Sequence, residues 1–363
     1  MAAMKYQIVL LGTPWNEESI YKTIGLYTGV EFVDVDDVDN KYPLLYLYFG
    51  KNKGDASVNE HIDKLLHDAV SKHIIQPIAE VPDDFKSKIP PILKGLNGFF
   101  MKQDDLPSVN RLGNYVASFF GLVNSNKKVF ISYRRTELDT LAQKLYVSLI
   151  KMKYHPFLDS YSIEAGVDFQ EYLRHELVDS DILILLDSPD FNSSEYCMEE
   201  FNIANQERIP VLDIRFNVDP KKNMHRFCDF YETGMDCAEA NKSDELPSKI
   251  IEIMEGCQIR AYQAKRKFVI DAFNAHCNRY DLHAVEQGGF LRCDTTHECF
   301  YPLTRIPTVN DMFHIHTMFK SLPLFSTYSK QILYNGSYCR PDLQSCLSWL
   351  DSNLPINVVN VNK

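Results

Sequence analysis

The stretches KKVFISYRR, residues 127–135, and SSEYCMEEF, residues 193–201, decide the fold of this chain. The first holds an apolar, β-prone run, Val129–Tyr133, and ends in two arginines. The second opens with good helix N-caps and follows another apolar run, Asp181–Leu186. Near-continuous apolar strands are typical of a parallel sheet that is covered on both faces. Polar side chains that follow such strands lie at the carboxyl edge of the sheet, where open α/β folds bind ligands.

Strand and helix signals alternate through this region. Strands are predicted at Val129–Tyr133, Pro156–Asp159, Asp181–Leu186 and Pro210–Phe216. Between them, apolar positions recur every three or four residues, as from Leu138 to Leu149 and from Phe169 to Leu177, which is the helical period. The pattern therefore predicts an α/β domain built on a central parallel sheet.

The order of these elements resembles that of a Toll/interleukin-1 receptor (TIR) domain. The resemblance is carried by FISYRR at 130–135, EAG at 164–166, SD at 180–181, SP at 188–189 and S-x-Y-C-x-x-E at 194–200. These are separate motifs in the family's order and spacing, and they extend over residues 127–256, about a third of the chain. The resemblance implies a flavodoxin-like fold.

TIR domains comprise adaptors that only assemble and enzymes that break the nicotinamide glycosidic bond of NAD. In the enzymes a Glu lies three residues after the Cys of the S-x-W/Y-C-x-x-E motif, and that position is Glu200 here. Helical periodicity puts Glu200 on the same face as Cys197 and Ala204. The resemblance thus makes Glu200 the candidate catalytic residue, with NAD as the substrate and no cofactor.

A single carboxylate suits this chemistry because nicotinamide is already a cationic leaving group and needs no general acid. The carboxylate would stabilise the oxocarbenium-like ribose that remains. Other candidate substrate-binding residues border the dinucleotide by resemblance. They are Tyr133, Arg134, Arg135, Phe157, Tyr161, Ser162 and Cys197. The two arginines offer planar, always-charged donors that suit a pyrophosphate.

Each candidate also has a purely structural interpretation. Glu200 near a helix N-terminus complements the helix dipole, and the arginines can pair with an acidic surface. Tyr133 and Phe157 fit a partly buried core position, and Cys197 fits a small buried hydrophobe.

Composition bounds the class of protein. The chain has 363 residues, enough for two or three domains, with 45% hydrophobic and 24% charged residues. Its formal net charge of −11 disfavours broad nonspecific binding to nucleic acid or anionic membranes, so no nucleic-acid partner is expected. No apolar run reaches the length of a signal peptide core or a membrane span, and the nine cysteines are irregularly spaced. These features predict a cytoplasmic protein with reduced thiols and no membrane partner.

The flanking segments are less informative. Residues 1–122 alternate strand and helix patterns and are expected to form a degenerate, noncatalytic TIR-like or receiver-like α/β domain. The TIR domain is expected at 127–256, and residues 257–363 are expected to form a small α+β domain of unknown type. The last segment is rich in Cys and His, but it has no paired C-x2-C units, so no metal site is expected.

The sequence favours a regulated NAD glycohydrolase that releases nicotinamide and ADP-ribose and resembles prokaryotic anti-phage immune effectors. Two alternatives stay open: a noncatalytic scaffold that acts by homotypic assembly, and a synthase of a cyclic ADP-ribose messenger. The resemblance also implies a homo-oligomer with TIR–TIR contacts, in which the loop Ser160–Gly166 leans on a neighbour through Ile163. An activating ligand or protein is expected but not identified.

Overall fold

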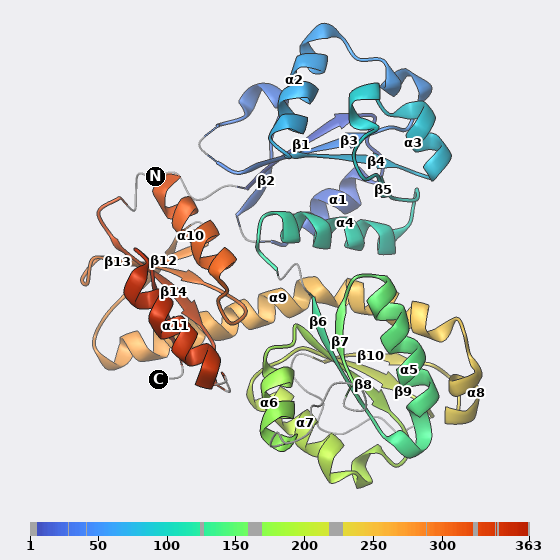
Figure 1. Cartoon of the computed structure of the whole chain (residues 1–363), viewed down its shortest axis with the longest axis vertical. Coiled ribbons are helices and arrows are strands. Elements are labelled where there is room, and N and C mark those ends of the chain that lie inside the picture. Colours follow the sequence, from blue (N-terminus) through green and yellow to red (C-terminus); the bar gives the residue numbers. More distant parts are fainter. Residues whose placement is uncertain are drawn as a thin grey trace. The chain divides into compact units, whose positions relative to one another are not determined.

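The computed structural model describes residues 6–361 except 28, 41, 124–126, 159–168, 218–227, 288, 322–325, 338 and 340. The chain divides into two compact units. The first consists of the residues up to Leu122 together with Glu286–Phe290 and a segment that begins at Met318, and the second consists of the remainder. The chain forms three five-stranded sheets with helices packed on them (Figure 1).

The first unit holds a five-stranded, all-parallel sheet of order β2-β1-β3-β4-β5. Its elements are β1 (Tyr6–Gly12), α1 (Glu17–Ile24), β2 (Val30–Phe32), β3 (Leu44–Phe49), α2 (Glu60–Ser71), β4 (Ile75–Ala79), α3 (Pro82–Lys88), β5 (Phe99–Phe100) and α4 (Leu106–Phe119). Gly12 ends β1 at φ +77°, and a Cβ there would lie 2.2 Å from the carbonyl oxygen of Phe49. This glycine is therefore required by the close approach of β1 and β3.

The second unit begins with another five-stranded parallel sheet, of order β10-β9-β8-β6-β7. Its elements are β6 (Lys128–Tyr133), α5 (Arg135–Lys151), β7 (His155–Phe157), α6 (Phe169–Val178), β8 (Ile182–Asp187), α7 (Glu195–Gln206), β9 (Val211–Arg215), β10 (Cys228–Glu232), α8 (Cys237–Lys242) and α9 (Leu246–Arg279). Both parallel sheets thus have the doubly wound order 2-1-3-4-5. The parallel-sheet α/β architecture predicted for these segments is confirmed.

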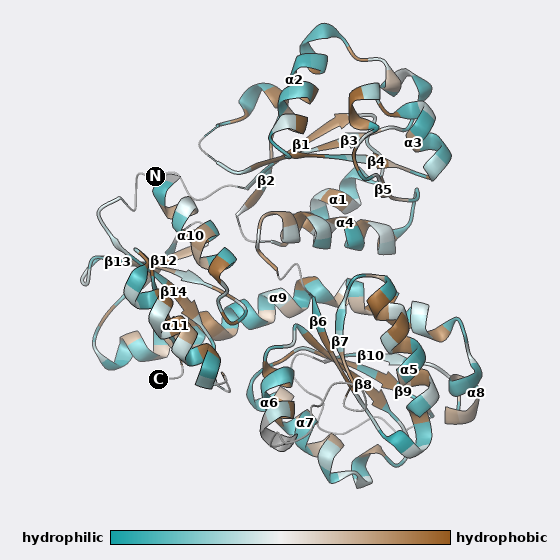
Figure 2. Ribbon diagram, in the orientation of Figure 1, coloured by the Kyte–Doolittle hydropathy of each residue, from teal (hydrophilic) through white to brown (hydrophobic). Residues whose placement is uncertain are grey.

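Alternating side chains cover both faces of the second sheet. On β6, Val129 and Ile131 are buried in one core cluster with α5 and α9, whereas Phe130 is buried in the other with α6 and α7. Strand β8 is buried along its whole length. Figure 2 shows the same pattern as apolar colour on the strands and mixed colour on the helices. The apolar runs of the sequence are therefore strands between two layers of helices.

Three features of this region were not predicted. The polar stretch after Phe216 contains β10, which adds to the edge of the sheet beside β9, and it is followed by the short helix α8. A single helix of 34 residues, α9, runs through Gly256. The division predicted at residue 256 therefore falls inside a helix.

The third sheet, which follows α9 in the sequence, is a mixed sheet of order β11-β12-β13-β14-β15. Its elements are β11 (Ala284–Gln287), β12 (Phe290–Cys293), β13 (Glu298–Pro302), α10 (Val309–Ser321), β14 (Ser329–Tyr334), α11 (Pro341–Asn353) and β15 (Asn357–Asn360). Strands β13, β14 and β15 are parallel, and β12 is antiparallel to β13. Crossover helices α10 and α11 connect the parallel strands, as such connections require.

Several predictions fall outside the described residues. Tyr161, Ser162 and the loop Ser160–Gly166 with Ile163 belong to this group. In the described part of the chain, no helix combines the length and the apolar character needed to cross a bilayer.

Candidate active site

A cavity of about 460 Å³ opens at the carboxyl end of β6, beside the N-terminus of α7. Its lining combines residues of β6 and of the start of α5, residues of α7 and of the turn before it, and one residue of α6. The lining residues are Ile131, Tyr133, Arg134, Arg135, Thr136, Leu173, Ser193, Ser194, Tyr196, Cys197 and Glu200. The order of the sheet reverses at β6 and β8, so the cavity lies where open α/β sheets bind ligands.

Glu200 is held in the cavity wall by a strand residue. Side chains alternate along β6, so Ser132 lies on the same face as Phe130, which packs in the cluster that includes α7. Ser132 Oγ donates a hydrogen bond to Glu200 Oε2 at 2.6 Å. Ser132 is buried and Glu200 is half-buried. The carboxylate therefore has a fixed donor on β6, and Glu200 also lines the cavity.

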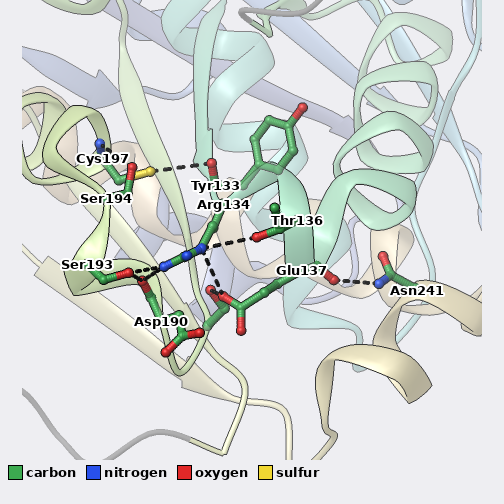
Figure 3. Close-up of polar contacts among 10 residues, drawn as sticks. Tyr133, Arg134, Thr136, Glu137, Asp190, Ser193, Ser194, Cys197 and Asn241 are labelled. Carbon is green, nitrogen blue, oxygen red and sulfur yellow. Dashed lines mark hydrogen bonds and ion pairs between the residues drawn. The ribbon is translucent and has the colours of Figure 1, made fainter.

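The N-terminus of α7 is tied to the end of β6 (Figure 3). Cys197, only 5% exposed, directs its thiol to the carbonyl oxygen of Tyr133 at 3.4 Å. Ser194 caps the helix by accepting from the backbone N–H of Cys197. Cys197 thus positions the helix against the strand, which agrees with its interpretation as a small buried residue, and it also lines the cavity.

Arg134 fastens the turn before α7 to the start of α5 (Figure 3). Its guanidinium donates to the carbonyl oxygen of Asp190 and to the Ser193 hydroxyl, and its Nε donates to Thr136 Oγ1 at 3.1 Å. The same Nε lies 4.0 Å from Glu137 Oε2. Arg134 is therefore a structural link in the cavity wall. Arg135, the first residue of α5, is exposed and also lines the cavity.

The remaining predicted residues divide between wall and core. The Tyr133 hydroxyl donates to Asp139 at 3.0 Å, and this tyrosine lines the cavity. Phe157 does not line it, because its ring stacks on Phe130 at 5.0 Å within the core. Phe157 thus has the core position that its structural interpretation expects, and its contact with the dinucleotide stays a prediction.

Glu199, the neighbour of Glu200, has a different environment. Its carboxylate pairs with Arg174 of α6, and it does not line the cavity. Successive helical residues point about 100° apart, so the two glutamates cannot share one direction. The helical period in the sequence was therefore enough to separate Glu200, which lines the cavity, from Glu199, which does not.

Sequence reasoning missed Ser132, Thr136, Leu173, Ser193 and Tyr196 as site residues. For Ser132 a signal existed, since a polar residue within an apolar β run on the helix-covered face requires a partner. Leu173 and Tyr196 come from α6 and α7, and only the folded arrangement brings them together. Among the described residues, no group of three or more His, Cys, Asp or Glu side chains could hold a metal ion.

The fold and the cavity define a doubly wound α/β domain with a ligand site at its switch point. Residues 129–245 match the family model of the TIR domain, so this part of the chain is a TIR domain. A curated relative from Brachypodium distachyon, described as a probable 2' cyclic ADP-D-ribose synthase, is 27% identical over 97 residues. The match covers 26% of this chain and 43% of that relative, so the chain spans less than half of its length.

A solved structure is also similar over most of the chain. It is the C-terminal domain of glucosamine-fructose-6-phosphate aminotransferase from Francisella tularensis, at 10% identity and a TM-score of 0.24. The likeness covers 72% of this chain and 86% of that one, and at this TM-score it supports no inference about function.

For the NAD cleavage that we propose for this site, Ser132→Ala is expected to slow the reaction about 10-fold to 100-fold, because a hydrogen bond to a charged group contributes about 1.5–3 kcal/mol. The measurement is the rate of nicotinamide release from NAD at a fixed protein concentration. Ser345→Ala, which removes a helix-surface hydrogen bond to the Pro341 carbonyl, is the matched control and should leave the rate unchanged. Equal rates in both variants would exclude Ser132 as the residue that positions Glu200.

Proposed function

We propose that the TIR domain cleaves the bond between nicotinamide and ribose in NAD. The observation that carries this proposal is the Glu200 carboxylate, held by Ser132 at 2.6 Å in the wall of a cavity of about 460 Å³. A cavity of this size lies within the range of small-molecule sites. The name of the Brachypodium distachyon relative, a cyclic ADP-D-ribose synthase, supports NAD as the substrate.

The chemistry needs charge stabilisation more than proton transfer. The nicotinamide ring is cationic before the bond breaks and leaves as a neutral molecule, so the positive charge passes to the ribose. A fixed carboxylate stabilises that developing charge and accepts hydrogen bonds from the ribose hydroxyls. Ser132 keeps Glu200 in one position, so little reorganisation is needed as the charge develops.

The pyrophosphate would bind in the same cavity beside Arg135 and the N-terminus of the 12-residue helix α7, which supply positive charge. Arg134 would act through the turn it fastens, because its guanidinium is engaged by Asp190 and Ser193. The two arginines then have different roles in substrate binding.

The product depends on what attacks the ribose cation. Water gives ADP-ribose, whereas an internal attack by another part of the same dinucleotide gives a cyclic isomer. We favour hydrolysis in a regulated effector that is held inactive until a signal arrives, since unrestrained NAD loss is toxic. Self-association through the TIR domain is part of this proposal.

The direct test is to incubate the purified full chain with NAD over a range of protein concentrations. Nicotinamide, ADP-ribose and cyclic isomers are then separated by chromatography and identified by mass. The proposal expects nicotinamide and ADP-ribose in equal amounts. Cyclic isomers in place of ADP-ribose would assign a synthase, and intact NAD at every protein concentration would contradict the proposal.

Arg135→Ala is expected to raise the KM for NAD about 10-fold, because one charged hydrogen-bond donor to the pyrophosphate is lost. Lys at this position should restore only part of the affinity, since an ammonium cannot make the planar, two-pronged contact of a guanidinium. Initial-rate kinetics of both variants provide the measurement. Arg279→Ala, at an exposed position near the end of α9, is the control and should leave KM unchanged. A normal KM in Arg135→Ala would leave Arg135 with a surface role.

A further inference from the structure

The mixed sheet β11-β12-β13-β14-β15 buries one face against the C-terminal half of α9. Register puts Leu291 opposite Phe300 and Cys293 opposite Glu298, so all four side chains share a face. Across this face, α9 contributes residues spaced four apart, and the resulting apolar cluster contains Val269, Phe273, Cys277, Leu291, Cys293, Phe300 and Leu333. The N-terminal half of α9 packs instead in the TIR core through Ile250 and Met254.

A second cavity, of about 420 Å³, lies between α9 and this sheet face. It is comparable in size to the TIR cavity, and nothing in the proposed reaction uses it. Its apolar walls include Phe273 of α9 and Phe300 of β13, whose ring centroids lie 4.5 Å apart and whose planes are tilted by 50°. Flat rings pack well against walls of this kind.

The polar lining of this cavity includes two hydrogen-bond acceptors, Glu298 and Gln331, beside His276, Thr296 and Asn360. Gln331 of β14 donates its side-chain N–H to Glu298 of β13. This bond occupies one carboxylate oxygen of Glu298, so the second carboxylate oxygen and the Gln331 amide oxygen are available to accept from a ligand. Both residues are half-buried and line the cavity.

The charge of the cavity selects against anions. None of the described residues that line it is Lys or Arg, and Glu298 is its only acidic residue. Burial, together with the neighbouring Cys293 and Glu298, raises the pKa of Cys277, so this thiol stays protonated at neutral pH and acts as an apolar wall. A phosphate or carboxylate would meet the Glu298 carboxylate and neither Lys nor Arg, with the His276 imidazole as the one basic group of the described lining, whereas a cationic or neutral N–H donor would find acceptors.

We propose that this cavity binds a small planar aromatic compound that carries a cationic or neutral N–H donor group, such as an amidinium, amine or amide. The ring lies among the apolar residues Phe273, Phe300 and Val359, and the donor group bonds to Glu298 and Gln331. This site is separate from the TIR cavity, so the proposal does not depend on NAD cleavage.

Three nearly isosteric probes separate charge from shape: benzamidine, benzamide and benzoate. They are titrated into the full chain with labelled Leu and Val methyl groups, and shifts of the Leu282 and Val359 methyls, which line the cavity, report occupancy. We expect saturable shifts of these methyls, with benzamidine the tightest, benzamide next and benzoate at least about 10-fold weaker than benzamidine. No saturable shift with benzamidine or benzamide at millimolar concentrations, or tightest binding of benzoate, would overturn the proposal.

A charge-removing variant tests the role of the carboxylate. Glu298→Gln keeps the shape and is expected to weaken benzamidine about 10-fold while it leaves benzamide within about 3-fold. Glu252→Gln, an exposed carboxylate on α9 that pairs with Lys249, is the control and should change neither. Unchanged benzamidine affinity in Glu298→Gln would reject the site as drawn. If this variant does not fold, the ranking of the three probes on the unaltered chain still tests whether the cavity prefers N–H donors to anions.

Discussion

Glu200→Gln is expected to lower the rate of nicotinamide release from NAD by at least about 100-fold, which is the usual effect of removing one fixed group that stabilises a developing charge. The change is nearly isosteric and keeps an acceptor for the Ser132 hydroxyl, so only the negative charge is lost. Since the ribose cation then has no counter-charge, the loss should appear in kcat more than in KM.

Glu199→Gln is the matched control because it removes the same charge one residue away. Glu199 pairs with Arg174 and does not line the TIR cavity, so its loss should change the rate by less than about 3-fold. The measurement is single-turnover nicotinamide release, with the melting temperature as a check that both variants fold. Equal losses of rate in the two variants would contradict the assignment of Glu200 as the catalytic residue.

Arg215→Met is expected to destabilise the TIR domain by about 3–5 kcal/mol, because it breaks a buried ion pair and leaves a buried carboxylate. Arg215 Nε donates to Asp213 Oδ2 at 2.9 Å, and the side chains of Arg215 and Asp213 are 3% and 4% exposed. The guanidinium also lies 4.3 Å from the centre of the Phe230 ring on β10. Thermal unfolding followed by circular dichroism should show a fall in melting temperature of roughly 10 °C.

Two further variants test whether the buried, unpaired carboxylate of Asp213 causes the loss of stability in Arg215→Met. Lys249→Met breaks an exposed pair with Glu252 and should cost less than about 1 kcal/mol. The double change Asp213→Leu with Arg215→Met removes both buried charges and should recover much of the stability lost in the single variant. A melting temperature for Arg215→Met equal to that of Lys249→Met would show that the pair contributes nothing.

The fully buried strands could be predicted from the sequence. Strand β8 lies in the middle of its sheet and is apolar from Ile182 to Leu186, so the sequence pattern identified it as a buried strand. The spacing of Cys197 and Glu200 likewise needed only the helical period, and both residues line one cavity.

Edge positions and long-range partners could not be predicted. Strand β10 pairs with β9 alone among the described strands and carries polar Asp229 and Glu232, so it lacks the apolar signature of a central strand. The domain boundary was expected at residue 256, yet α9 continues through Gly256, and Met254 and Cys257 near it are buried in the same core cluster as Val129 and Ile131 of β6.

Contacts between residues far apart in the sequence also could not be predicted from sequence patterns. Ser132 and Glu200 are 68 residues apart, and their hydrogen bond depends on how α7 packs on β6. The second cavity depends on the register of β12, β13 and β14 under α9, which sequence periodicity does not fix.

The measurement that tests the central claim most directly is release of labelled nicotinamide from NAD that carries the label in its nicotinamide ring. The unaltered chain and Glu200→Gln are compared at equal concentration across a wide dilution series. We expect release by the unaltered chain that matches the loss of NAD, and none above background by Glu200→Gln. Equal release by both proteins, or no release by the unaltered chain at any concentration, would contradict the account.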